Sequence, residues 1–239
     1  TFWQVRAGLL TIAQGSLPLV DPFSWTALGR PWTLNSWGFN VLMGVAYEVA
    51  GLVGVALFCA ILVAAIGGLV LYLARHLGAV PVVSACVLLI GGPLLTLYLS
   101  ARPQLVDYVA VLAPLAIGVL TVLWVNLHAA ALLGVAMVGA SLFLTFLKRT
   151  TRRRSGWLFA AFLIITFCSL INPYGAGLLT QTMQVKAQSV DVVEWQPFDP
   201  ADPLQLVLFA IGLLGFAVAA RRRDPIFAAV LIVAACGSI

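Results

Sequence analysis

The chain has 239 residues, of which 62% are hydrophobic and only 9% are charged, and its formal net charge at pH 7 is +5. So few charged residues leave too little polar surface to coat a soluble globule, which argues against the soluble globular class. The positive charge is not accompanied by a nucleic-acid-binding motif, and we expect no nucleic-acid partner.

The basic residues gather in three short breaks between apolar runs, at Arg75, Lys148–Arg154 and Arg221–Arg223, whereas most acids lie in the intervening breaks. Cytoplasmic loops of membrane proteins are enriched in Lys and Arg. The alternation therefore predicts an all-α polytopic membrane protein whose basic loops are cytoplasmic. Residues 1–50 and 176–203 are then extracytoplasmic segments of a single transmembrane domain that comprises residues 1–239.

Residues 1–50 are apolar but interrupted by prolines and acids, and they contain four of the seven tryptophans. This composition suits a membrane surface rather than a span, and it makes membrane lipids a partner. Apolar residues recur at helical spacing over residues 2–12, and Gly15 and Pro18 then stop the helix. We expect a second short helix over residues 36–50.

The first uncharged run long enough to cross a bilayer is 52–74, and residues 81–99 return to the outer face. The stretch 104–147 is too long for one crossing and too short for three full crossings. Either half-length helices meet at Pro114 and at 126–128, or a cytoplasmic loop near Pro114 is absent, which we favour. We expect residues 157–171 to cross next, followed by 204–220 and by 226 to the end. Further chain is expected before Thr1 and after Ile239.

Asn126 and His128 are the most unusual residues of the apolar part, because a polar group at membrane depth costs several kcal/mol when it has no partner. They are candidates for substrate binding near a polar cavity at the outer membrane border. The alternative is that His128 only bonds a neighbouring helix as a packing contact.

The outer breaks hold the other candidates. The carboxylate of Asp21 could act as a base, bind a divalent metal ion, or form an Asx turn. Arg102, in a turn with Gln104, could bind a lipid phosphate or pair with an acid. Glu194 beside Trp195 suits a sugar, which stacks on the indole and bonds the carboxylate, but the pair equally suits a membrane-interface anchor.

A series of short motifs occurs in a familiar order and spacing: Phe2–Gly8, Asp21–Ser24, Gly29–Trp32, Ala101–Gln104, Leu123–His128, Ile171–Gly175 and Glu194–Pro197. Over nearly its whole length the chain resembles bacterial membrane proteins of the GT-C glycosyltransferase superfamily, near the group that is similar to dolichyl-phosphate-mannose protein mannosyltransferases.

This resemblance implies a GT-C-like transmembrane helix bundle with membrane-parallel helices in the first outer loop. It also implies a polyprenyl-phosphate-linked sugar as donor, and a catalytic carboxylate just before Thr1. The sequence departs from the family pattern at three places: relatives often carry His where Gln4 stands, an acid near Asn40, and two glycines where Ala129 and Ala130 stand.

We therefore expect a multi-pass protein of the bacterial inner membrane that transfers a sugar from a polyprenyl phosphate to an acceptor of unknown identity on the extracytoplasmic face. Asp21 is the candidate catalytic residue. The candidate substrate-binding residues are Arg102, Gln104, Asn126, His128, Glu194 and Trp195. No cofactor is certain from the sequence, and a divalent metal ion is the one candidate. The alternative is a non-catalytic scaffold or lipid-binding subunit.

Overall fold

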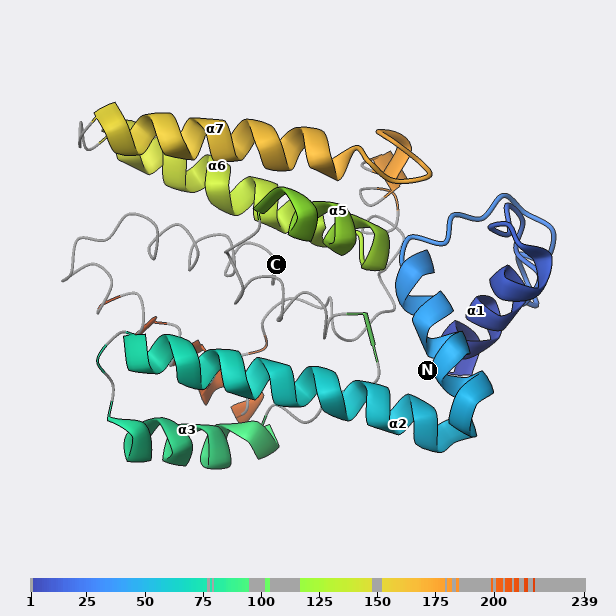
Figure 1. Ribbon diagram of the computed structural model, residues 1–239, viewed down its shortest axis with the longest axis horizontal. Helices are drawn as coiled ribbons and strands as arrows, with labels where there is room; N and C mark the ends of the chain where they lie inside the picture. Colours follow the sequence, from blue (N-terminus) through green and yellow to red (C-terminus); the bar gives the residue numbers. More distant parts are fainter. Residues whose placement is uncertain are drawn as a thin grey trace. The chain divides into compact units, whose positions relative to one another are not determined.

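The computed structural model describes residues 2–76, 78, 80–94, 102–103, 117–147, 152–178, 180–181, 184, 199, 201–203, 205–207, 209–210, 213–214 and 217. These residues are mostly helical and contain no strand; one isolated antiparallel bridge joins Val20 to Pro31. The all-α prediction is thus confirmed for this part of the chain. The chain separates into two compact units, Thr1–Ala130 and Ala131–Ile239, which are described separately below (Figure 1). The prediction of a single transmembrane domain stays a prediction.

The first helix, α1 (Phe2–Gln14), agrees closely with the predicted helix. It ends where expected, because Gly15 adopts a φ of 62° and its N–H donates to the carbonyl of Ile12 at 3.3 Å. Its buried residues are Gln4, Val5, Ala7, Gly8 and Thr11.

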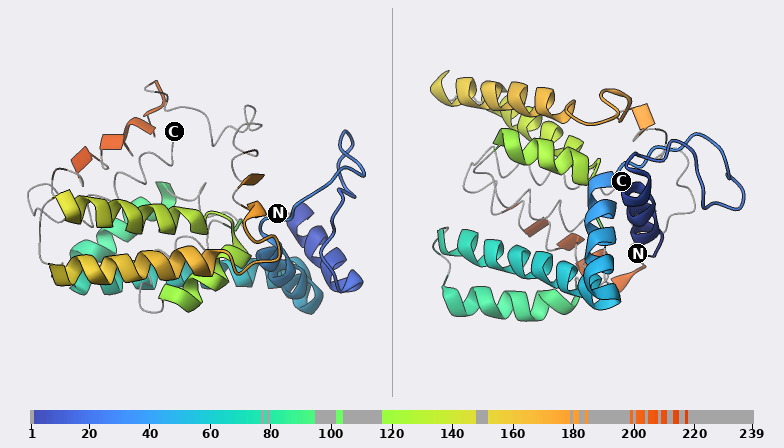
Figure 2. Two further views of the ribbon diagram at one scale, coloured as in Figure 1. Left: turned by 90° about the horizontal axis from the view of Figure 1, so that it is seen from above. Right: turned by 45° about the vertical axis from the view of Figure 1, so that its right-hand side comes forward.

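The second helix, α2 (Trp37–His76), is bent at Ala50 and Gly51, where the backbone leaves the helical region. Gly51 has φ 59° and ψ −143°, a conformation open essentially to glycine alone. Figure 1 and the right panel of Figure 2 show a short arm before the bend and a long arm after it. The predicted helices over 36–50 and from residue 52 onward are therefore both confirmed, and they are joined without a loop.

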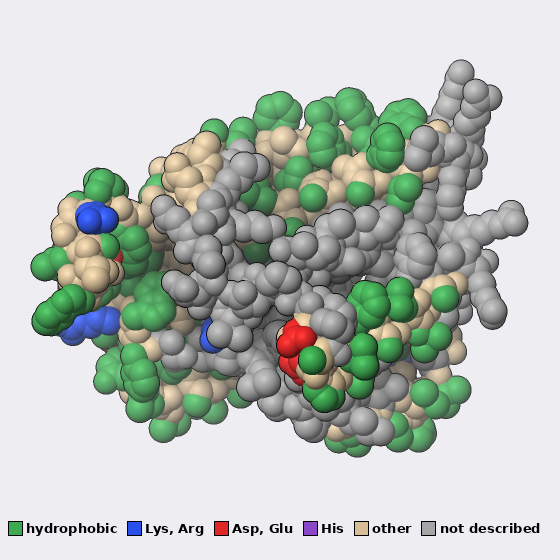
Figure 3. Space-filling view, turned by 180° about the vertical axis from the view of Figure 1, so that it is seen from behind, with side chains coloured by type: hydrophobic (Ala, Val, Ile, Leu, Met, Phe, Trp, Pro, Cys, Tyr) green, Lys and Arg blue, Asp and Glu red, His purple; other side chains and the backbone are tan. Residues whose placement is uncertain are grey.

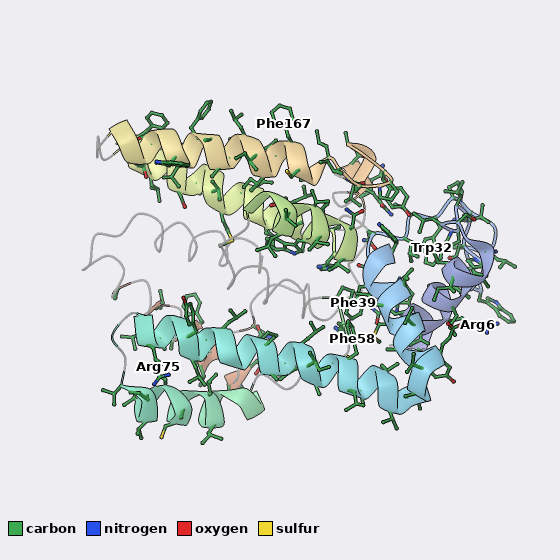
Figure 4. All side chains as sticks on the ribbon, in the orientation of Figure 1. Arg6, Trp32, Phe39, Phe58, Arg75 and Phe167 are labelled. Atoms are coloured by element: carbon green, nitrogen blue, oxygen red, sulfur yellow. The ribbon has the colours of Figure 1, made fainter. Side chains whose placement is uncertain are left out.

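The short arm of α2 packs tightly against α1 through glycines. A methyl group on Gly8 would overlap the backbone carbonyl of Asn40, and one on Gly44 would come within 3.0 Å of the Gly8 carbon and the Leu9 nitrogen. Phe39, on the same arm, reaches Phe58 on the long arm, with ring centroids 5.9 Å apart (Figure 4). These contacts join α1 and both arms of α2 in one packed group.

Two shorter helices pack against α2 in the first unit, α3 (Pro81–Leu94) and α5 (Ile117–Leu127). α5 has 11 residues, so it is about 16 Å long at 1.5 Å per residue. It ends at the predicted polar break. Residues 104–116 lie outside the described part of the chain, so the favoured interpretation, that a loop near Pro114 is absent from the sequence, stays a prediction.

In the second unit, α6 (Ala131–Leu147) and α7 (Arg152–Ser169) lie side by side (Figures 1 and 2). The ring of Phe162 lies 3.1 Å from the position that a methyl group on Gly139 would occupy, so the glycine makes room for the ring. The predicted break after residue 171 is present as an Asx turn, in which Asn172 Oδ1 accepts from the N–H of Tyr174 at 2.8 Å. The predicted segments 176–203, 204–220 and 226–239 lie mostly or wholly outside the described residues.

The segment Trp37–Tyr72 is the only helix among the described residues that is long and apolar enough to cross a membrane. Only 11% of the residues in its most apolar window are buried, whereas the core helix of a soluble protein is mostly buried. Gly118–Leu127, Ala131–Phe146 and Ser155–Ser169 are apolar but shorter.

The helices bury small polar side chains and expose large apolar ones. Ser84, Thr121, Ser141, Thr145 and Ser169 are buried. In contrast, large apolar side chains are exposed along α2, α5, α6 and α7, among them Leu57, Ile61, Val119, Phe143, Phe146 and Phe167. Phe167 points outward from α7 in Figure 4, and apolar side chains predominate among those coloured in Figure 3.

Several buried hydroxyls donate to backbone carbonyls of their own helices. Ser141 and Thr145 donate to the carbonyls four residues earlier, at 2.8 and 2.7 Å, and Thr11 donates in the same way to Ala7 at 2.8 Å. Such bonds leave the helix with few polar groups that need water.

Candidate functional site

The predicted polar break at residues 126–128 joins α5 to the start of α2. Asn126 Oδ1 accepts a hydrogen bond from Trp37 Nε1 at 3.2 Å, and its Nδ2 donates to the carbonyl of Val122 at 2.7 Å. The backbones also approach closely, because a methyl group on Gly38 would lie 2.8 Å from the Asn126 carbonyl oxygen. The amide of Asn126 is therefore paired across helices within the first unit.

His128 directly follows α5 and is half-buried. Its backbone N–H donates to the carbonyl of Trp124 at 2.7 Å, which closes the last turn of the helix. This placement at a helix end, next to the interhelical bond of Asn126, is compatible with both the substrate-binding and the packing interpretation. The predicted cavity stays a prediction.

Asp21 is held within its own loop, and 9% of its surface is exposed. Its Oδ1 accepts from the N–H groups of Phe23 at 2.8 Å and Ser24 at 2.9 Å, and its Oδ2 accepts from the Ser24 hydroxyl. This is the Asx turn that was one of the three interpretations of Asp21.

These bonds set the protonation behaviour of Asp21. The Ser24 hydroxyl, followed by the N–H groups of Phe23 and Ser24, lowers the pKa of the carboxyl below 3.8, and partial desolvation opposes the shift only weakly. A carboxylate with a lowered pKa is a poor proton acceptor at neutral pH. Its chemistry fits a fixed anion better than a general base.

Residues 19–32 form a hairpin with Asp21 at its neck. The N–H of Asp21 donates to the carbonyl of Arg30 at 2.9 Å, and the N–H of Gly29 donates to the carbonyl of Asp21 at 2.8 Å. Trp32 lies between Phe23 and Trp3 of α1, with ring centroids 5.9 and 6.5 Å away. The hairpin is thereby attached to α1.

Replacing Asp21 with Asn should destabilise the protein only where the carboxylate is ionised. The amide can keep the Oδ1 bonds, but it cannot accept from the Ser24 hydroxyl with its second atom. Because the folded-state pKa lies below 3.8, this contribution is complete above that value and is lost as the pH falls through the folded-state pKa. The difference in Tm between the wild type and Asp21→Asn, measured in detergent, should shrink toward zero as the pH is lowered from neutral to acid. Glu48→Gln, which removes the charge of an exposed acid, is the control. An unchanged difference at the acid end would contradict this assignment.

Two buried amides at the contact of α1 and α2 were not among the predicted site residues. Asn40 is fully buried and neither of its side-chain polar atoms has a partner; Gln4 is 4% exposed and its Oε1 has no partner. Leaving a buried polar group without a partner costs about 1–3 kcal/mol. Both are among the positions at which the resemblance to the GT-C superfamily led us to expect other residues, and that difference was the signal that could have identified them.

Of the remaining predicted residues, the structure describes only one. Arg102 is half-buried. Gln104, Glu194 and Trp195 lie outside the described residues, so the expected convergence of Asp21, Arg102, His128 and Glu194 stays a prediction. Within the described ranges, no group of three His, Cys, Asp or Glu side chains could hold a metal ion.

Comparisons of the chain with protein-family models, with curated proteins and with solved structures found no match.

Proposed function

We propose that the chain is a polytopic protein of the bacterial inner membrane with a GT-C-like helix bundle. It transfers a sugar from a polyprenyl-phosphate donor to an acceptor on the extracytoplasmic face. The observation that carries this proposal is the arrangement of residues 2–76, in which two short helices pack together and then lead, through the bend at Gly51, into a long apolar helix. The resemblance implies this same order, with two surface helices preceding a span.

The distribution of side chains supports placement in a bilayer. Helices that bury Ser and Thr and expose Leu, Val and Phe are suited to a solvent that is itself apolar. The hydroxyls bonded within their own helices fit the same solvent, because hydrocarbon offers no hydrogen-bond partners. The same distribution of buried hydroxyls and exposed apolar side chains is found on α6 and α7 of the second unit. It therefore favours several crossings of the membrane.

The proposed reaction has two chemical demands. The acceptor hydroxyl attacks the anomeric carbon and loses its proton to a base, and the bond from that carbon to the phosphate oxygen breaks. A cation near the departing phosphate stabilises its charge. We assign the cation to Arg102 in the outer turn, with His128 as a second phosphate contact. Asp21 is the carboxylate that orients the acceptor, a role that its ionised and fixed state supports.

Arg102→Ala should abolish sugar transfer, by a factor of at least about 100 if a charge-assisted phosphate contact is lost. Membranes from cells that produce the chain are supplied with a panel of radiolabelled polyprenyl-phosphate monosaccharides, and release of polyprenyl phosphate is measured. Arg102→Lys should recover part of the activity, and Arg75→Lys, on the opposite side in the proposed topology, should retain it. Retention of wild-type turnover by an inserted Arg102→Ala protein would overturn the assignment.

A non-catalytic scaffold or lipid-binding subunit is the second candidate, and two observations favour it. The Asp21 carboxylate is engaged by three hydrogen bonds in its own loop, and the buried amides Gln4 and Asn40 carry no ionisable group. If no donor of the panel is consumed by the wild-type chain although the donors bind to it, this second function replaces the first.

A further inference from the structure

The hairpin of residues 19–32 presents apolar side chains to its surroundings. Trp25 at its tip is 99% exposed, and Leu19 and Leu28 are 70% and 68% exposed. Val20 and Phe23 are exposed as well. Trp25 is flanked by Ser24 and Thr26, and its exposure shows that it packs against almost nothing in the described part of the chain.

This apolar tip rests on an ordered base. The N–H of Trp32 donates to the carbonyl of Leu19 at 2.8 Å, which closes the hairpin, and the Asp21 carboxylate caps the turn at Phe23 and Ser24. Gly29 adopts a φ of 76°, which the turn back toward Trp32 requires. A hairpin ordered in this way presents Trp25 without a further entropic cost of ordering the loop.

The charged groups around the hairpin are cationic. Arg30 within it and Arg6 on α1 are both exposed. Both lie next to the Trp3–Trp32 contact, since Arg6 is three residues from Trp3 on the helix and Arg30 two residues from Trp32. The one acid of the hairpin, Asp21, is buried and bonded to its own loop. Figure 4 shows Arg6 and Trp32 at the same end of the first unit, where Figure 3 shows apolar and basic side chains together.

We propose that residues 19–32 are a membrane anchor, whose tip at Trp25 enters the headgroup region of a bilayer while Arg30 and Arg6 contact the phosphates of anionic lipids. Trp is enriched at membrane–water interfaces, and exposed cations beside an apolar surface complement an anionic leaflet. The irregular backbone limits the depth, because unpaired N–H and C=O groups are not tolerated in hydrocarbon. The proposal rests on the membrane placement proposed above, and not on the transferase activity.

Depth measurements with a spin label test the anchor. In a chain whose cysteines 59, 86, 168 and 236 are replaced with alanine, Trp25→Cys is labelled with a nitroxide. The labelled chain is reconstituted in vesicles of phosphatidylcholine with phosphatidylglycerol. The measured quantity is the ratio of the label's collision rate with oxygen to its collision rate with a water-soluble nickel chelate. This ratio should be several-fold higher at position 25 than for a label at Ser16→Cys, an exposed polar position of the segment that precedes the hairpin. Replacing Arg6 and Arg30 with Gln should reduce this ratio in anionic vesicles but not in vesicles of phosphatidylcholine alone.

Three results would overturn the anchor: a ratio at position 25 equal to that at position 16, a label shielded from both reagents as in a protein–protein contact, and an effect of the two arginines that is independent of lipid charge. Each of these results is measured on correctly inserted protein, with neither sugar donor nor acceptor present. An inactive chain that still shows the expected depth would refute the transferase and leave the anchor intact.

Discussion

Gly8→Ala is expected to disrupt the contact between α1 and α2 and to lower the stability of the first unit by about 3 kcal/mol. A methyl group at position 8 would overlap the backbone carbonyl of Asn40, and a backbone atom cannot move aside as the end of a flexible side chain can. The helices must therefore separate, which also loosens the fully buried Phe39 and Met43 on the short arm of α2. The loss is measured as a lowered Tm in detergent.

The matched control is Gly67→Ala in the long arm of α2. No atom of the described residues outside its own helical turns lies within 4 Å of a methyl group there. Since Ala favours a helix by up to about 1 kcal/mol over Gly, this variant should be neutral or slightly stabilised. Equal melting temperatures for the two variants would show that the glycine contact does not hold α1 against α2.

Gly51→Ala is expected to be the second most damaging substitution, with a cost of about 1–3 kcal/mol. Its φ of 59° with ψ −143° places a methyl group in steric conflict with the neighbouring backbone, although nothing else lies within 4 Å of that position. The conflict is relieved if α2 changes its bend, so the variant should change the angle between the two arms. Distances between spin labels at Leu42 and Ile61, two exposed positions on opposite sides of the bend, report that angle.

Gly68→Ala serves as the control for the bend, because Gly68 lies in the regular long arm and no atom in the described part of the chain lies within 4 Å of a methyl group there. It should leave the distribution of distances unchanged. A Gly51→Ala protein with wild-type distances and Tm would mean that the positive φ at this position is not required.

Much of the first 76 residues could be predicted because the signals are local. Gly15 ends α1, and the change from broken to uninterrupted apolar sequence near residue 51 separates the two arms of α2. The Asx turn at Asp21 was one of three predicted roles for the same reason, since Asp-Pro in a loop indicates a turn. The sequence could not indicate that the arms are joined at a sharp bend, because the backbone angles of Gly51 depend on the packing of both arms.

The composition and the apolar periodicity by themselves predicted that the chain is helical, which holds for the described residues, and the polar residues Asn126 and His128 indicated a break in the apolar sequence. Only the tertiary structure decided the partners: Trp37 for Asn126, the carbonyl of Asn40 against Gly8, and Trp32 between Phe23 and Trp3. Helix periodicity depends on residues three and four apart, whereas each of these contacts joins residues much farther apart in the sequence. Tertiary packing also revealed the buried amides of Gln4 and Asn40, because burial without a partner is a property of the surroundings and not of the residue.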